Sequence, residues 1–266
     1  MPDNPQSMTS KPAVPAGRRV YAIGDVHGRL DLLHALACAI EEDNRAARSA
    51  RSTVIMLGDL IDRGPHSRAV VDYVLDWQLR REMRIISGNH EEMLLSCMTN
   101  PAVLVHFLRY GGTETLESYG IDPASLDITD FEGVRQALLH AIPGRHKAFV
   151  ESFENMVEVG DYLFVHAGIA PDQPLKKQKT SDLRWIREPF LSHQSPHSHV
   201  VVHGHTITRE VQLRANRIGI DTGAYRHGRL TALVLEGSER RFLQARDEAE
   251  AIYVVRMSES EVSGGL

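Results

Sequence analysis

One pattern recurs five times along this 266-residue chain: a short apolar run ends at glycine together with aspartate, asparagine or histidine. The five copies read YAIGDVHG, IMLGDLIDRG, IISGNHE, LFVHAG and VVHGH. A short apolar run before such a turn predicts a buried β-strand, and open α/β sheets carry their chemistry at the carboxyl ends of their strands. Five such ends are hard to explain as coincidence, so we expect them to meet at one site.

The stretch 52–68 supplies two kinds of ligand from one loop. Asp59 directly follows the predicted strand, and Asp62 and Arg63 precede the turn at Gly64. A carboxylate suits a metal ion, whereas a guanidinium suits phosphate oxygens. Taken alone, this stretch fits an ordinary strand-loop-helix crossover with solvated charges equally well. The four other strand ends favour the metal site.

Oxygen and imidazole donors follow the strands, and cysteine is absent from these turns. Such donors suit manganese, iron, zinc or similar divalent ions. A carboxylate such as Asp59 can bridge two ions that lie about 3.5–4 Å apart. The number of ligands is sufficient for two ions. The predicted metal ligands are Asp25, His27, Asp59, Asn89, His166 and His205.

Three side chains next to these ligands suit hydrolysis of a phosphate ester. Arg63 stays charged and can bind non-bridging phosphate oxygens through two donors. His90 could protonate the leaving oxygen, and Asp62 could orient its ring. Two neighbouring ions would lower the pKa of a shared water for in-line attack on phosphorus.

Charge and cysteine content exclude several classes of protein. The chain has 30 basic and 35 acidic residues, and its formal charge of -5 argues against a dedicated nucleic-acid or anionic-membrane surface. Cys38 and Cys97 fall in predicted helices and form no disulfide framework, which favours a reducing cytoplasm. No segment approaches the ~18 consecutive apolar residues of a membrane span. We expect a cytoplasmic protein with no nucleic-acid or membrane partner, in an oligomeric state that the sequence leaves open.

The order of the patterns predicts one α/β (α+β) domain over 18–256. Residues 99–152 carry many glycines and prolines and no ligand-bearing strand end, so we expect a helical insertion that covers the site. After Gly160 six apolar runs follow, which we expect to form a second mixed sheet packed against the first. The polar stretches 1–17 and 257–266 predict flexible tails.

The motifs GDVHG, GDLIDRG, GNHE, HAG and HGH, in this order over about 21–235, resemble the phosphoprotein phosphatase branch of the calcineurin-like metallophosphoesterases. The likeness is greatest to the bacterial and phage lambda phosphatases. It implies the four-layer metallo-dependent phosphatase fold, with two facing mixed sheets flanked by helices. It also implies two divalent ions, with manganese expected first and iron or zinc as alternatives.

The resemblance assigns roles to individual residues. One ion is held by Asp25, His27 and Asp59. The second is held by Asp59, Asn89, His166 and His205. His90 is the general acid supported by Asp62, and Arg63 binds phosphate. The segment WIRE at 185–188 matches the tryptophan-x-arginine-glutamate segment of these relatives, which makes Arg187 the second phosphate arginine.

We therefore expect a serine/threonine protein phosphatase that acts on a phosphorylated protein or peptide. The symmetric dinucleoside tetraphosphatases are the alternative, together with small-molecule phosphoesterases. They usually carry aspartate where this chain has Glu91, and usually lack the sequence Asp-Arg-Gly found at 62–64. A non-catalytic scaffold would be expected to have lost metal ligands, whereas here every ligand position is filled. The preference among phosphorylated side chains stays open.

Other polar side chains fit structural roles better than catalytic ones. Asp221, in IDTGAY, ends a strand, and we favour a turn-stabilising carboxylate over a catalytic one. The loop SHQSPHSH leaves an accessory metal site as an alternative to a plain surface loop. The histidines concerned are His34, His106, His140 and His146 on predicted helices, and His193, His197 and His199 in this loop.

Overall fold

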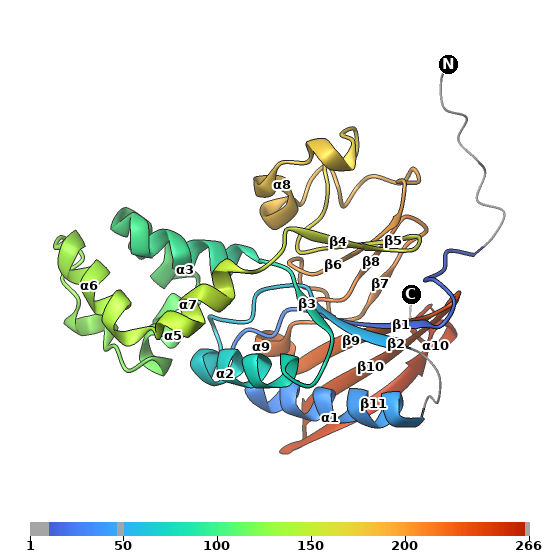
Figure 1. The fold of residues 1–266 in the computed structure, drawn as a ribbon, viewed down its shortest axis with the longest axis horizontal. Coiled ribbons are helices and arrows are strands. Elements are labelled where there is room, and N and C mark those ends of the chain that lie inside the picture. The colour runs from blue at the N-terminus through green and yellow to red at the C-terminus, as the bar shows by residue number, and fades with distance from the viewer. Residues whose placement is uncertain (1–10, 47–50, 264–266) are drawn as a thin grey trace.

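The computed structural model describes residues 11–46 and 51–263. Two β-sheets face each other, one of six strands in the order β11-β10-β9-β1-β2-β3 and one of five in the order β4-β5-β6-β8-β7. Figure 1 shows α1 and α2 on the outer face of the first sheet and α8 beyond the second. The predicted fold of two facing mixed sheets flanked by helices is confirmed.

The first sheet joins parallel strands from the start of the chain to antiparallel strands from its end. Helices α1 (Leu30–Ala46) and α2 (Ser67–Gln78) connect the parallel strands and contribute their apolar faces to the core. The strands are β1 (Arg18–Ile23), β2 (Arg51–Met56), β3 (Met83–Ile85), β9 (Arg229–Glu236), β10 (Glu239–Glu248) and β11 (Ala251–Ser258).

The second sheet is smaller than predicted. Three of the six apolar runs after Gly160 form β9, β10 and β11 and belong to the first sheet, because β9 pairs antiparallel with β1. An apolar pattern identifies a strand but not its neighbour. The second sheet contains β4 (Met156–Val159), β5 (Tyr162–Val165), β6 (Val200–His203), β7 (Gln212–Leu213) and β8 (Arg217–Gly219).

The central strands are buried on both faces, which explains their continuous apolar sequences. In β1, Tyr21 and Ile23 pack toward the helices, whereas Val20 and Ala22 pack between the sheets against Phe164. Successive side chains of a strand point to opposite faces, so one strand contributes to two cores. Each large apolar side chain buried in this way contributes about 1.5–3 kcal/mol. This packing fixes the positions of the strand ends.

Between β3 and β4 the chain forms helices, which gather at one end of the molecule (Figure 1). A 3-10 turn at Pro101–Val103 and a π-helical turn at Leu108–Gly112 connect the first of these helices, and a 3-10 turn at Pro123–Ser125 precedes α6. The helices are α3 (Asn89–Thr99), α4 (Leu104–Phe107), α5 (Thr113–Ser118), α6 (Phe131–Ala141) and α7 (Gly144–Glu151). Shorter helices follow later in the chain, namely α8 (Thr180–Trp185), α9 (Ala224–His227) and α10 (Glu259–Ser263), with a 3-10 turn at Leu175–Lys177.

The predicted flexible tails differ from the structure. The C-terminal tail 257–266 is wrong over 257–263, because Met257 pairs with Phe242 in β10 and α10 follows β11. Of the tail 1–17, Val14 is only 3% exposed and its N–H donates to Gly237 O at 2.9 Å. Residues 1–10 and 264–266 lie outside the described residues. Within the part of the chain that is described, no helix has both the length and the apolar character to cross a membrane.

Candidate functional site

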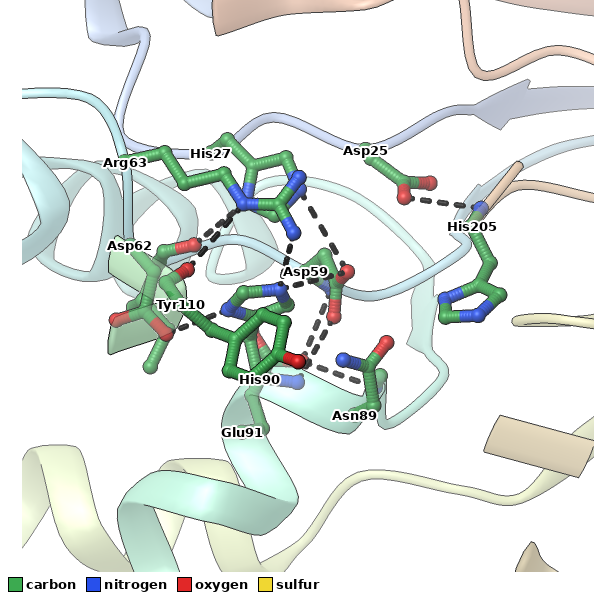
Figure 2. A network of polar contacts seen from close by, with 12 residues as sticks. Asp25, His27, Asp59, Asp62, Arg63, Asn89, His90, Glu91, Tyr110 and His205 are labelled. Carbon is green, nitrogen blue, oxygen red and sulfur yellow. Dashed lines mark hydrogen bonds and ion pairs between the residues drawn. The ribbon is translucent and has the colours of Figure 1, made fainter. Parts of the chain in front are cut away.

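Side chains from both sheets meet at the carboxyl ends of five strands. Asp59 follows β2, and its carboxylate belongs to two groups of potential metal ligands. One group adds His27 and His90, the other adds His166 and His205, and the ligand atoms within each group lie within 4.8 Å of one another. Figure 2 shows Asp25 and His205 on one side of Asp59, and His27, His90 and Arg63 on the other.

The Asp59 carboxylate lies at the centre of the site. Its Oδ2 is 3.6 Å from His27 Nε2 and 3.4 Å from His166 Nε2. Asp59 is 2% exposed. Burial alone would raise its pKa, but His166, His90 and His27 outweigh this effect and lower the pKa below its ordinary value. A buried anion between two groups of imidazoles is suited to bridge two cations.

Backbone carbonyls set the tautomers of two histidines. His27 Nδ1 lies 2.9 Å from Ile61 O, and His166 Nδ1 lies 2.8 Å from Leu57 O. A carbonyl can only accept, so each Nδ1–H donates and each Nε2 presents its lone pair toward Asp59. Burial lowers the pKa of both histidines and favours the neutral rings that metal binding requires.

Unpaired lone pairs indicate that cations fit this site. His166 Nε2 faces Asn89 Oδ1 at 2.9 Å, and with Nδ1 protonated both atoms are acceptors. Among the described residues, Asp25 Oδ1 and His205 Nε2 are buried without a hydrogen-bond partner. Buried polar atoms in this condition cost about 1–3 kcal/mol each. Divalent ions would satisfy all four atoms, so the donor set fits the predicted metals.

Asp25 and Asp221 form a second pair of buried acidic side chains. Burial raises the pKa of Asp25 well above its ordinary value, and the Asp221 and Asp59 carboxylates raise it further. Burial also raises the pKa of Asp221 to about 7. Asp221 Oδ1 accepts from Gly223 N at 3.0 Å, which is the expected turn-stabilising contact. Its Oδ2 is buried and has no partner within the described residues, and Asp221 is close enough to Asp25 to raise the pKa of that carboxyl group.

Two strand-end glycines are required by close approach to these carboxylates. A Cβ on Gly88 would lie 2.0 Å from Asp59 Oδ1, and one on Gly204 would lie 1.9 Å from Asp25 Oδ1. Any larger residue would displace a carboxylate. The glycine next to each ligand is therefore part of the site geometry.

The backbone of the site is strained. Seven non-glycine residues in the described part of the chain have left-handed φ angles, and five of them are His27, Asp59, Asp62, Arg63 and His205. Each such conformation costs on the order of 1–3 kcal/mol and persists only where surrounding contacts hold it. The strained backbone therefore coincides with the predicted metal ligands and with Arg63.

Glu91 supplies contacts that hold this strained loop. Its carboxylate accepts from Asp59 N at 2.9 Å, Leu60 N at 2.7 Å and Gly88 N at 2.9 Å. It is fully buried. Burial, and next the Asp59 charge, raise its pKa to about 7, while the three N–H donors oppose that rise. In the sequence, Glu91 served only to distinguish protein phosphatases from dinucleoside tetraphosphatases. No sequence pattern indicates that its side chain turns back to the backbone at the end of β2.

His90 is engaged through both ring nitrogens. Nδ1 lies 2.6 Å from Asp62 Oδ2, and Nε2 lies 3.0 Å from Arg63 Nη2. Thr115 Oγ1 donates to Asp62 Oδ1 at 2.6 Å, a contact from the helical segment that the sequence did not predict. Burial lowers the pKa of His90, but Asp59 and Asp62 outweigh it and raise that pKa. These contacts suit proton transfer at Nε2 better than metal ligation.

Arg63 lies beside the two groups of potential metal ligands and contacts two tyrosines. Its Nη1 donates to Tyr225 OH at 2.9 Å, and its guanidinium lies 4.7 Å from the centre of the Tyr225 ring. Its Nε donates to Tyr110 O at 3.3 Å. The N–H groups of Arg63 that are not used in these contacts can bind an anion near the predicted metal ligands.

Arg184 and Arg187, which lie between β5 and β6, differ in their contacts. Arg184 donates to Asn155 Oδ1 at 3.0 Å and lies 3.7 Å from Glu92 Oε2. Arg187 is exposed, and its side chain makes no hydrogen bond or ion pair with other described residues, although its backbone carbonyl accepts from Leu191 N at 2.8 Å. Burial, together with His166 and the Arg187 charge, lowers the pKa of His205 to about 3, opposed by Asp59. Arg187 is therefore near the site but not fixed on it.

The remaining histidines show structural contacts. His146 is buried and lies 3.0 Å from both Tyr119 OH and Asp72 Oδ1. His193 and His197 stack with ring centres 4.8 Å apart. The groups of potential metal ligands found within 11–46 and 51–263 include no histidine of this loop, so the alternative of an accessory metal site gains no support.

Comparison with known proteins gives one family and several relatives. Residues 18–226 match the model of the calcineurin-like phosphoesterases. The asymmetrical bis(5'-nucleosyl)-tetraphosphatase PrpE of Oceanobacillus iheyensis is 24% identical, over 80% of this chain and 87% of that protein. The corresponding protein of Anoxybacillus flavithermus is 26% identical, over 79% and 88%. The symmetrical enzyme of Pseudomonas fluorescens is 30% identical, but over only 59% of this chain and 45% of its own.

Solved structures share the fold at low sequence identity. A putative diadenosine tetraphosphatase has a TM-score of 0.60 and 20% identity, covering 94% of this chain and 100% of its own. The cold-active protein-tyrosine phosphatase of a Shewanella species has a TM-score of 0.54 and 17% identity, covering 92% and 82%.

Proposed function

Because this chain belongs to the calcineurin-like phosphoesterase family, we propose that it is a metal-dependent hydrolase of bis(5'-nucleosyl)-tetraphosphates. The observation that carries the proposal is Asp59, whose carboxylate is shared by two groups of imidazoles beside a phosphate-type arginine. The relatives that match over most of both chains bear the name of the asymmetrical enzymes. We expect unequal products, a nucleoside monophosphate and a triphosphate.

The proposed ligand sets share Asp59. Asp25, whose buried Oδ1 has no partner among the described residues, would take the place of His90 and hold one divalent ion with His27 and Asp59. Asp59, Asn89, His166 and His205 would hold the other. When bound, the ions polarise phosphate oxygens and lower the pKa of a shared water. The chain itself keeps His27 and His166 in the tautomer that leaves Nε2 available.

The remaining roles follow from the contacts of His90 and the arginines. His90 donates the Nε2 proton to the leaving oxygen, and Asp62, held by Thr115, keeps the Nδ1 proton in place. Arg63 binds the non-bridging oxygens with its planar pair of donors, and Arg187 contributes a second positive charge. Both arginines balance the charge that a polyphosphate brings to a site rich in carboxylates.

Phosphoprotein hydrolysis, which the sequence pattern favours, is the second candidate. It is supported by the Asp-Arg-Gly sequence at 62–64 and by glutamate at position 91. Glu91 reaches three backbone N–H groups, which a shorter aspartate could not do without movement of the chain. The relatives named as tetraphosphatases make a dinucleotide the first candidate and a phosphopeptide the second.

A substrate comparison decides between the two candidates. The protein is reconstituted with Mn²⁺, Fe²⁺ or Zn²⁺ and offered diadenosine tetraphosphate, a phosphoserine peptide and p-nitrophenyl phosphate. We expect kcat/KM for the dinucleotide to exceed that for the peptide by about tenfold or more, with AMP and ATP as products. Rapid hydrolysis of the peptide with an intact dinucleotide would refute the proposal in favour of a protein phosphatase. Two molecules of ADP would indicate symmetrical cleavage and refute the expected asymmetry.

A further inference from the structure

A wide-open surface cavity of about 460 Å³ adjoins Arg63, and several of its lining residues have no role in the chemistry described above. It lies between the loop after β2, the turn before α5 and the start of α9. Small-molecule sites of proteins commonly have volumes of about 300–1,000 Å³. The residues that line it are Arg63, Arg109, Tyr110, Gly111, Glu114 and Tyr225.

The cavity presents an accessible aromatic ring. Tyr110 is 43% exposed, and its backbone carbonyl already accepts from Arg63 Nε. Figure 2 shows it on the same side of Asp59 as Arg63. The Tyr225 hydroxyl and ring are both occupied by Arg63. The Tyr110 ring contacts His106, with ring centres 4.4 Å apart, and its exposed part is available to stack with a flat group of the ligand. Stacking on tyrosine is a common way to bind a nucleobase.

Glu114 supplies a hydrogen-bond acceptor that has no donor. Its Oε2 is buried, yet no hydrogen-bond partner for it occurs in the described part of the chain. Glu114 is half-buried and lines the cavity, so a rotation of its side chain would bring this oxygen to a ligand that carries N–H donors. Guanine offers N1–H and an adjacent amino group, which match the two oxygens of a carboxylate. Adenine offers one amino group next to a ring nitrogen acceptor, and that acceptor would face the carboxylate with a lone pair.

Gly111 fixes the cavity relative to the phosphate site. Its φ is 105°, its carbonyl accepts from Arg63 N at 2.9 Å, and a Cβ there would lie 2.5 Å from Arg63 Cγ. Only glycine allows the turn before α5 to approach the Arg63 loop this closely. If a nucleotide binds Arg63 through its phosphate, its nucleoside would therefore lie against a cavity wall whose position relative to Arg63 is fixed.

We propose that this cavity is a nucleobase subsite that prefers guanine, with the base stacked on Tyr110 and its N1–H and amino group donating to Glu114. The inference rests on the proposed tetraphosphatase function and specifies its substrate, namely a dinucleoside tetraphosphate with at least one guanosine. Arg109, which lines the same cavity, adds positive charge near the polyphosphate.

The test is a calorimetric titration of the Mn²⁺-loaded protein with GDP and with ADP, the nucleotides being checked for integrity afterwards. We expect GDP to bind about tenfold or more tightly than ADP. Glu114→Gln should weaken GDP binding about tenfold and change ADP binding less than about threefold. Tyr110→Ala should weaken both nucleotides about tenfold, whereas Tyr110→Phe, which keeps the ring, should retain both.

Two exposed residues outside the cavity provide matched controls, Glu117 on α5 and Tyr253 on β11. Glu117→Gln and Tyr253→Ala should leave both titrations and the hydrolysis of p-nitrophenyl phosphate unchanged. Equal binding of GDP and ADP by the wild type would overturn the proposal. It would also be overturned if Glu114→Gln left GDP binding intact or weakened both nucleotides alike.

Hydrolysis of diguanosine and diadenosine tetraphosphates separates this inference from the proposed function. If both are cleaved at equal rates and GDP and ADP bind equally, the guanine subsite is wrong and the tetraphosphatase function stands. If neither is cleaved while p-nitrophenyl phosphate is, the tetraphosphatase function itself is wrong.

Discussion

At the scale of single residues, His90 is held between a carboxylate and a guanidinium. Asp62 accepts from Nδ1, and Arg63 lies at Nε2. Arg63 favours a neutral ring, whereas Asp59 and Asp62 raise the pKa and favour a proton on Nε2. A proton with such opposed neighbours can be given up to a leaving oxygen and regained from water.

This arrangement predicts that His90 matters most for poor leaving groups. His90→Asn should lower kcat by roughly 10²–10⁴ for esters of weakly acidic alcohols and by much less for p-nitrophenyl phosphate. With a series of aryl phosphates, the plot of log kcat against the pKa of the leaving phenol should become steeper. Metal content, measured in parallel, should stay that of the wild type. An unchanged slope, or loss of metal, would show that His90 has another role.

Arg187 and Arg184 offer a paired test three positions apart. Arg184 already binds Asn155 and lies near Glu92, whereas Arg187 has its charge near His205 and no fixed partner among described side chains. Arg187→Ala should lower kcat/KM about tenfold or more, and Arg187→Lys should lower it by an intermediate factor, because lysine lacks the planar pair of donors. Inhibition by free phosphate should weaken in parallel. If Arg184→Ala impairs phosphate binding and Arg187→Ala does not, the assignment belongs to Arg184.

At the scale of elements, the helical segment between β3 and β4 is part of the site and not only a cover. Thr115 on α5 holds Asp62, and Gly111 holds the backbone of Arg63. The glycines and prolines of 99–152 predicted a helical insertion, but not which loop of the site its turns would contact. Such long-range contacts leave no periodic trace in a sequence, which explains why Thr115, Tyr110 and Glu91 were not predicted as site residues.

Substitutions of Gly111 and Gly120 test the contact between the turn before α5 and the Arg63 loop. The two glycines are comparable because both have left-handed φ angles, 105° and 84°. A Cβ on Gly111 would meet the Arg63 backbone nitrogen at 2.8 Å, whereas one on Gly120 has nothing within 4 Å. Gly120→Ala should cost only backbone strain, about 1–2 kcal/mol. Gly111→Ala should cost about 1–3 kcal/mol more and should weaken phosphate inhibition, measured by urea unfolding and by inhibition kinetics. Equal effects of the two variants would show that the close contact of Gly111 with the Arg63 loop is not important.

At the scale of the whole molecule, the site exists only where the two sheets face each other. Asp25, Asp59 and Asn89 follow strands of the first sheet, and His166 and His205 follow strands of the second. The repeated strand-end pattern predicted this meeting because each motif carries its ligand locally. The sheet to which β9, β10 and β11 belong was predicted wrongly, because strand pairing depends on which edge is free after the rest has folded.

The concentration of buried carboxylates predicts how stability changes with pH in the metal-free protein. Burial raises the pKa of Asp221 from 3.8 to about 7. Since the folded value exceeds the unfolded one, the contribution of this group is present below about pH 4 and is lost as pH rises through about 7. Asp221→Asn carries no charge, so its free energy of unfolding relative to wild type should increase across that interval.

Urea unfolding in EDTA at about pH 4 and about pH 8 measures this difference, and Mn²⁺ should reduce it by offsetting the charge repulsion. Asp76→Asn, an exposed change on α2, is the control and should show no such trend. A difference between Asp221→Asn and wild type that does not depend on pH would show that the pKa of Asp221 is not raised by folding.

In the proposed site Asp59 joins two metal sites into one, and counting the metal ions bound by Asp59→Asn tests this role. After reconstitution with Mn²⁺ and dialysis, elemental analysis should find two ions per chain in the wild type and in Asp76→Asn. Asp59→Asn should lose ions from both groups and hydrolyse substrate about 10²-fold or more slowly, because one carboxylate serves both coordination spheres. Two retained ions per chain with near-normal turnover would contradict the shared site.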